Sequence, residues 1–297
     1  MRQMLLLAIA MAAMSPALAQ APAIDTQGAA SIPNLTGVWR HQSLPGFEPL
    51  ASGPTSVTNR SRRNGVSNYD ALVGDYTNPI LKPEAAAIVK AHGDISLAGV
   101  TYGNPANQCW PEPVPFIYKN FGMMMLQGPD HITFFYDEGP DVRRVRMNAS
   151  HPEKVTPSFY GDAVGHYEGD TLVIDTIGQR VDRPFAMLDL YGTPYTDKLH
   201  VVERYRLISY EEAQDGLKRD AKENQRVPGD IDPNYRGQFL QVTFTVEDDG
   251  VFTTPWSATI TYRPALAPWV ETICAENTNE YYYNKQSDIP TSAKPDF

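Results

Sequence analysis

Two stretches near the C-terminal end of the chain, Phe239-Leu-Gln-Val-Thr-Phe-Thr-Val246 and Pro255-Trp-Ser-Ala-Thr-Ile-Thr-Tyr-Arg263, decide the fold class. In both, apolar residues at every second position alternate with Gln, Ser or Thr. Successive side chains of a β-strand point to opposite faces, so this alternation predicts two strands with one buried and one solvated face. Such strands are typical of an antiparallel sheet.

Similar patterns, separated by turn residues, precede and follow these two strands. Together they predict a mainly β fold, an antiparallel meander of about nine or ten strands. An open sheet of that size would leave long unpaired edges, so we expect a closed, lipocalin-like barrel, with a β-sandwich as the alternative. The other expected strands are residues 35–40, 131–136, 142–147, 160–167, 171–177, 199–208 and 269–274.

The segments between these strands predict one short helix and several long loops. Residues 82–93 have the features of a helix, with Pro83 in the first turn, Glu84 at the positive end of the dipole and Gly93 as the end. Residues 47–76, rich in Gly, Pro, Ser and Asn, predict a surface wrap. Residues 211–237 predict a solvated charged insertion, in which 211–223 could form a short exposed helix, and residues 284–297 a loose tail. One domain is expected over residues 32–283.

The N-terminal residues predict export. Arg2 precedes an apolar run from Met4 to Met14, and Ala17-Leu-Ala19 forms a small-x-small cleavage pattern. The run is shorter than the about 20 residues of a membrane-spanning helix. We expect a signal peptide over residues 1–19, a disordered arm over 20–31, and a mature protein in the periplasm or secreted, with no transmembrane segment.

Composition and missing motifs exclude several classes of function. The formal net charge is −10, which disfavours a surface that follows nucleic-acid phosphates. No dinucleotide-binding fingerprint, phosphate loop, nucleophile elbow or His-Glu-x-x-His motif occurs in the sequence. We therefore expect no cofactor, no metal and no nucleic-acid partner. The sequence does not indicate an oligomeric state.

The chain contains two cysteines, Cys109 and Cys274. In an oxidising compartment, two cysteines predict one disulfide. The alternatives are a metal pair or a catalytic thiol, but neither cysteine has a Cys-x-x-Cys spacing or an adjacent His. Closing so long a loop would stabilise the fold by roughly 4–5 kcal/mol in the chain-entropy model.

Gly37-Val38-Trp39 at the start of the first strand resembles the G-x-W signature of lipocalin-like barrels. The resemblance implies that Trp39 closes one end of the barrel and stacks with an Arg from a late strand. Arg263 or Arg40 could be that partner.

A second resemblance covers most of the mature chain, and is to a large group of exported, largely uncharacterised proteins from soil bacteria. It implies fold and compartment and no particular activity. Two positions depart from the pattern, because Asp162 and Tyr195 stand where the group would have His. The blocks that carry the resemblance are residues 35–39, 78–87, 109–111, 127–131, 151–152, 165–176, 200–206 and 274–277.

Candidate site residues cluster between residues 151 and 206. Alternation places Tyr160, Asp162, His166 and Glu168 on one face of their strand. A phenol, a carboxylate and an imidazole on one face could bind a polar group or transfer a proton. The alternative is an ordinary outward polar face. His151 lies in a loop, where functional residues are common.

Two carboxylates stand between apolar residues at alternate strand positions. His200 and Arg204 share one face of their strand, which leaves Glu203 on the apolar face, where a carboxylate needs a partner. Glu203 could pair with an Arg as a structural bridge or serve a function. Asp175, between Val173 and Ile177, could form an acid pair with it. The remaining histidines that we assign to the surface are His41 and His92.

Three functions are compatible with these features. The first is an exported, lipocalin-like protein that binds a small apolar or aromatic molecule in a barrel cavity. The second is a cofactor-independent lyase, isomerase or hydrolase in the same cavity, which requires inward-facing His and carboxylate groups. The third is an envelope interaction protein that uses its long loops.

Overall fold

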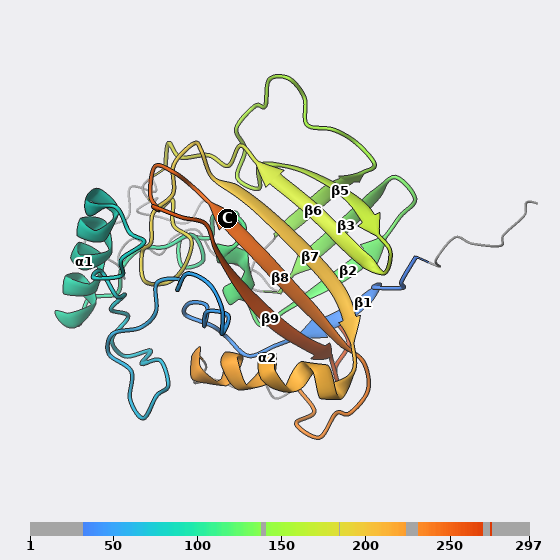
Figure 1. The fold of residues 1–297 in the computed structure, drawn as a ribbon, viewed down its shortest axis with the longest axis horizontal. Helices are drawn as coiled ribbons and strands as arrows, with labels where there is room; N and C mark the ends of the chain where they lie inside the picture. The colour runs from blue at the N-terminus through green and yellow to red at the C-terminus, as the bar shows by residue number, and fades with distance from the viewer. Residues whose placement is uncertain (1–31, 138–140, 184, 224–230, 270–273, 275–297) are drawn as a thin grey trace, which may run out of the picture. The chain divides into compact units, whose positions relative to one another are not determined.

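The computed structural model describes residues 32–137, 141–183, 185–223, 231–269 and 274. Nine strands close into a barrel in the order in which they follow one another in the chain (Figure 1). The expected mainly β barrel is confirmed, and the sandwich alternative is wrong. The strands are β1 (Gly37–Arg40), β2 (Gly122–Gln127), β3 (His131–Tyr136), β4 (Val142–Met147), β5 (Asp162–Glu168), β6 (Thr171–Ile177), β7 (His200–Ile208), β8 (Phe239–Glu247) and β9 (Trp256–Pro264).

The alternating pattern that predicts the fold corresponds to β8 and β9. In β8, Val242 and Phe244 are fully buried, whereas Thr243 and Thr245 are half-buried on the other face. The two strands pair in antiparallel register, with Phe244 opposite Ala258. The apolar face of each strand therefore points into the barrel, as alternation requires.

Two strands differ from the sequence-based expectation. The sequence does not predict β2, because its Gly-Met-Met-Met-Leu-Gln run has no polar residue at alternate positions. It nevertheless pairs with β1 over Gly122–Met125 and with β3 over Met123–Gln127. Most of the strand expected at residues 269–274 lies outside the described residues.

The barrel is not a purely antiparallel meander. The pair β4–β5 is parallel and has two residue pairs in register, Arg146 with Val164 and Met147 with Gly165. A parallel pair requires a longer connection than a hairpin, and residues 148–161 supply it. We call this junction the β4–β5 seam.

Helix α1 (Pro83–Leu97) extends beyond the predicted end at Gly93. Ala85, Val89 and His92 share its buried face. Gly93 lies inside the helix, at a position where a Cβ would come within 2.9 Å of a methyl of Val73. The glycine permits close packing and does not end the helix.

Helix α2 (Tyr210–Glu223) confirms the short helix expected at residues 211–223. It packs against β8 and β9, so the prediction of a solvated insertion is wrong for this segment (Figure 1). Ala213 forms a buried apolar cluster with Ile208 and Phe239. Asp220 accepts a hydrogen bond from the backbone N–H of Thr261 at 2.9 Å. Residues 224–230 lie outside the described part of the chain.

The surface wrap expected over residues 47–76 contributes to the core. Phe47 and Val57 are 3% and 2% exposed. The ring of Phe47 contacts Phe244 edge-on at 5.0 Å between centroids and stacks on Trp256 at 6.3 Å. The prediction of an external wrap is therefore wrong at these two residues.

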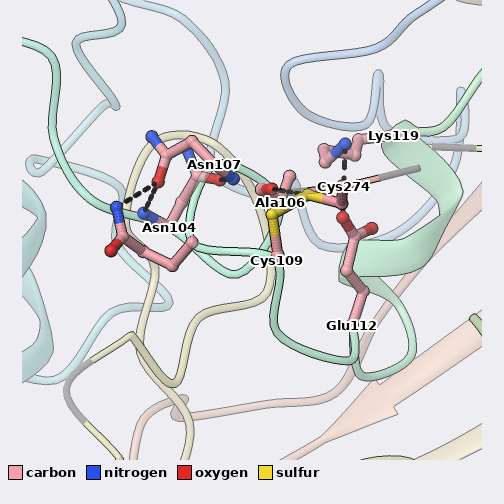
Figure 2. The surroundings of a disulfide bond; sticks show 8 residues. Asn104, Ala106, Asn107, Cys109, Glu112, Lys119 and Cys274 are labelled. Carbon is pink, nitrogen blue, oxygen red and sulfur yellow. Dashed lines mark hydrogen bonds and ion pairs between the residues drawn. A yellow bond between two sulfur atoms is a disulfide. The ribbon is translucent and has the colours of Figure 1, made fainter. Parts of the chain in front are cut away.

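The cysteines form the predicted disulfide, with 5.6 Å between the Cα atoms of Cys109 and Cys274 (Figure 2). It ties the loop after α1 to the C-terminal part of the chain. The expected signal peptide (1–19), arm (20–31) and tail (284–297) lie outside the described residues. Within the described part, neither helix is long and apolar enough to cross a bilayer.

Trp39 is 7% exposed, and its Nε1 donates a hydrogen bond to the carbonyl of Leu35 at 2.9 Å. Arg263 lies over the ring of Phe239, at 5.7 Å from the centroid, and Arg40 lies 5.9 Å from the centroid of Trp269. Arg263 and Arg40, the two expected partners of Trp39, therefore each contact another aromatic ring.

Candidate functional site

Several predicted site residues meet on the outer face of the barrel. Asp162, Asp175 and His200 belong to β5, β6 and β7, and His151 reaches them from the connection between β4 and β5. The register places Ile177 between Asp162 and His200 in neighbouring strands. Residues paired across neighbouring strands face the same side of a sheet, so these side chains gather at one place.

A continuous series of hydrogen bonds joins five residues, which we call the outer chain: His151, Asp162, Asp175, His200 and Glu247. His151 Nδ1 lies 2.7 Å from Asp162 Oδ2, and its Nε2 lies 3.1 Å from Asp175 Oδ1. His200 Nε2 lies 3.0 Å from the same Asp175 oxygen, and its Nδ1 lies 3.4 Å from Glu247 Oε2. A neutral imidazole has one N–H, so each ring donates to both of its carboxylates only in the protonated form.

The outer chain is better suited to holding strands together than to catalysis. A general base needs a nitrogen within reach of a substrate proton, but both nitrogens of His151 face carboxylate oxygens. In addition, Arg146 of β4 donates to Asp162 of β5 at 2.8 Å. The outer chain and Arg146 therefore bridge the β4–β5 seam from the outside.

The other outward residues form a second, exposed group. His166 Nε2 lies 3.1 Å from Glu168, and Arg204 donates to the other oxygen of Glu168 at 2.6 Å. These hydrogen bonds, first that of Arg204 and then that of His166, lower the pKa of Glu168. The side chains are about half exposed, so each pair contributes little to stability.

Tyr160 does not share the face of Asp162, so that prediction is wrong. Gly161 has a φ of +72° and turns the chain before β5 begins. Tyr160 packs against the core instead, and its hydroxyl donates to Asp141 at 2.5 Å. Burial raises the pKa of the Tyr160 phenol.

Glu203 points into the barrel, where it forms the structural bridge that its strand position allows. Arg143 donates to Glu203 Oε1 at 2.8 Å and also to Oε2. The hydroxyl of Tyr205 donates to Oε1 at 2.7 Å, and that of Tyr118 donates to the same oxygen. Arg143 also donates to Thr176 at 2.7 Å. We call these five residues the inner network. All five are fully buried, and burial raises the pKa of both tyrosines.

The inner network corrects two expectations. Asp175 cannot form an acid pair with Glu203, because Glu203 is paired with Ile174 and points inward while Asp175 points outward. The enzyme hypothesis required inward-facing His and carboxylate groups in the barrel cavity. Asp162, His166 and His200 all lie on the outer face, so that version of the hypothesis is wrong.

A pocket lies beside the barrel, next to the C-terminal end of α1. Its volume is about 290 Å³. We call it the side pocket. Three segments form most of its wall: residues 69–72, the last turns of α1, and residues 99–104. The residues that line it include Tyr69, Asp70, Leu72, His92, Val100 and Tyr102.

His92 is the buried imidazole of this pocket, so its assignment to the surface is wrong. The residue is 4% exposed, and its ring lies 4.1 Å from the ring of Tyr102. Burial lowers the pKa of His92 to about 4, so the ring is neutral near pH 7. His41, also assigned to the surface, is 2% exposed beside Tyr262, and burial lowers its pKa to about 3.

The disulfide lies close in sequence to the pocket wall. The backbone N–H of Asn104 donates to the side chain of Asn107 at 2.8 Å, and that of Asn107 donates back to Asn104 at 3.1 Å (Figure 2). The side-chain amide of Asn107 donates to the Tyr102 carbonyl at 2.9 Å. These bonds connect the disulfide loop at Cys109 to the wall residues Tyr102 and Asn104.

No protein-family model matches this chain, and comparison with curated proteins and with solved structures also gives no match. Within the described ranges, no group of three or more His, Cys, Asp or Glu is arranged to hold a metal ion. The site must therefore be interpreted from its own geometry.

The sequence-based candidates do not include the side pocket. Its residues come from segments that are distant in sequence, and alternation along a strand gives no information about them. One local signal was available. Ala85, Val89, His92 and Ser96 recur at helical spacing, which places His92 on the apolar face of α1.

Proposed function

We propose that this protein binds a small organic molecule, and that the ligand occupies the side pocket instead of the barrel lumen. The observation that carries the proposal is a pocket of about 290 Å³ with two tyrosine rings, a neutral buried imidazole and the side chain of Leu72 in its wall. Small-molecule sites typically begin at about 300 Å³ and combine apolar walls with a few polar groups.

The lumen is a poorer candidate because the inner network crosses it. Arg143 of β4 and Glu203 of β7 belong to strands that are not neighbours, so their ion pair spans the interior. A ligand there would have to displace a fully buried charge pair. Removing one partner from such a pair costs about 3–5 kcal/mol.

The surrounding structure supports a preformed side pocket. One wall is the last turns of α1, and another is fixed by the reciprocal bonds between Asn104 and Asn107 near the disulfide. A preformed wall lowers the entropy cost of ordering groups when a ligand binds. We also propose that the protein acts outside the cytoplasm, on the basis of the signal peptide expected at residues 1–19 and the disulfide.

The test uses two substitutions that fill the pocket, Leu72→Trp and Val100→Trp. Val181→Trp is the matched control, since Val100 and Val181 are loop valines that are 39% and 42% exposed. Single-ring aromatic compounds, cationic, neutral and anionic, are screened against the oxidised protein by saturation-transfer NMR. We expect at least one compound to bind the wild type and the control and to lose binding in both pocket variants.

Either of two results would refute the proposal. One is a panel in which no compound binds. The other is binding that survives both pocket substitutions or is blocked only by Val181→Trp, because that result places the ligand elsewhere. Thermal unfolding of each variant shows that the loss does not come from a disrupted fold.

A further inference from the structure

We infer that the ligand of the side pocket is a small organic cation, with an ammonium group on an aromatic or apolar body. The inference depends on the proposed function, because it specifies the ligand class for the same pocket. Three features of the pocket support it: its aromatic residues, its negative groups, and the lack of Lys and Arg among the described residues that line it.

Aromatic residues make up part of the pocket wall. Tyr69, His92 and Tyr102 all line the pocket, and the rings of His92 and Tyr102 lie 4.1 Å apart at an interplanar angle of 39°. The negative face of an aromatic ring attracts a cation within about 6 Å of its centroid, and quaternary ammonium ligands are commonly bound in this way.

Two negative groups also lie at the pocket. One is Asp70, which is among the residues that line it. The other is the C-terminal end of α1, since Ser96 in its last turn and Gly99 and Val100 just beyond it line the wall. A helix carries a partial negative charge at its C-terminal end. No basic residue lies in the last turn of α1 to offset that charge.

The positive groups near the pocket do not favour an anion. No Lys or Arg is present among the described residues that line it, and His92 is neutral near pH 7 because burial lowers its pKa to about 4. Arg63 lies 3.8 Å from Asp70, but both side chains are at least 70% exposed. Lys90 is paired with Asp94 on the surface of α1, at 2.6 Å.

The test compares three ligands of similar size by isothermal titration of the oxidised protein. They are 4-hydroxyphenyl-trimethylammonium, its uncharged isostere 4-tert-butylphenol, and the anion 4-hydroxyphenylacetate. We expect the cation to bind at least tenfold more tightly than the isostere, and the anion to bind most weakly. The ratio between cation and isostere should fall as the salt concentration rises.

Asp70→Asn separates the charge contribution from shape. It should weaken binding of the cation about threefold, a modest change because the carboxylate is largely exposed, and leave binding of the isostere unchanged. Asp249→Asn is the matched control, since its side chain is 76% exposed and Asp249 is not among the residues that line the pocket. Tyr69→Leu should likewise reduce the preference for the cation at least threefold.

The outcomes distinguish this inference from the proposed function. If the isostere or the anion binds as tightly as the cation, and Val100→Trp abolishes that binding, the pocket is a ligand site but the inference is wrong. If none of the three ligands binds, or if Val100→Trp has no effect on binding, both fail. Equal losses in Asp70→Asn and Asp249→Asn would also overturn the inference, since they would indicate only a change in net charge.

Discussion

Replacing Arg143 with Met should destabilise the protein strongly, because the substitution leaves the carboxylate of Glu203 buried without its cation. Both side chains are fully buried, and Arg143 donates to both oxygens of Glu203. Only the hydroxyls of Tyr118, Tyr205 and Thr176 would remain for that carboxylate. We expect the free energy of unfolding to fall by about 3–5 kcal/mol, a large share of the about 5–15 kcal/mol of a typical domain.

The second charge provides the decisive comparison. Glu203→Gln in the Arg143→Met background removes the unpaired carboxylate and keeps a side chain that can bond to the tyrosine hydroxyls. The double variant should therefore recover at least 2 kcal/mol relative to Arg143→Met, a coupling expected for residues in direct contact. Urea denaturation followed by tryptophan fluorescence measures both values, provided that the m-value stays constant.

A loss below about 1 kcal/mol for Arg143→Met would refute this account of the inner network. So would a double variant that is less stable than the single one. Ligand binding gives an independent readout. The folded fraction of Arg143→Met should bind the side-pocket ligand with the wild-type affinity. If the ligand were bound in the lumen, the substitution would change that affinity.

Three further predictions follow from other parts of the fold. Burial raises the folded-state pKa of Asp220 from its ordinary value of 3.8 to about 8, so its contribution to stability is present below pH 4 and is lost as the pH rises through 8. Asp220→Asn keeps the hydrogen bond from the Thr261 N–H and removes the titrating carboxyl. Its free energy of unfolding relative to wild type should therefore rise by a few kcal/mol between pH 4 and 8, measured by urea denaturation. Parallel pH profiles of the two proteins would contradict this. Replacing Cys109 and Cys274 with Ala should lower the free energy of unfolding by up to about 4–5 kcal/mol and weaken ligand binding in the side pocket. An unchanged affinity in titration calorimetry would show that the disulfide does not support the pocket wall. His151→Gln should lower the free energy of unfolding by about 1–2 kcal/mol and speed amide hydrogen exchange in residues 148–161 without changing ligand affinity. Unchanged exchange rates would show that the outer chain does not hold this connection.

Local alternation accounts for most of the barrel. The apolar positions of β8 and β9 have the predicted orientation, because alternation along a strand records its pleat. The predicted solvated face is wrong for part of β9, since the outward Thr259 and Thr261 are 5% and 2% exposed. β2 does not record it, since methionine occupies both inward and outward positions: Met123 and Met125 are fully buried, and Met124 between them is half-buried. Nor does any local pattern show that β4 and β5 are parallel.

The two carboxylates show where strand patterns mislead. Glu203 lies among inward residues, and the sequence correctly predicts that it needs a partner. Asp175 lies between Val173 and Ile177, which predicts the same environment, but all three point outward. Val173 is only 4% exposed on that outer face, where its register neighbours are His166 and Arg204. Burial therefore does not by itself identify the inner face.

The way in which the barrel closes supports a ligand site outside the lumen, as we propose. The β4–β5 seam has two residue pairs in register, so backbone hydrogen bonds alone hold it weakly. Side chains on both faces compensate: Arg143 reaches from β4 to Thr176 and Glu203 inside, and Arg146 reaches from β4 to Asp162 outside. The inner pair occupies the interior that a lipocalin-like protein would use for its ligand. A ligand site in this protein would then have to lie outside the lumen, and the side pocket meets that requirement without weakening the seam.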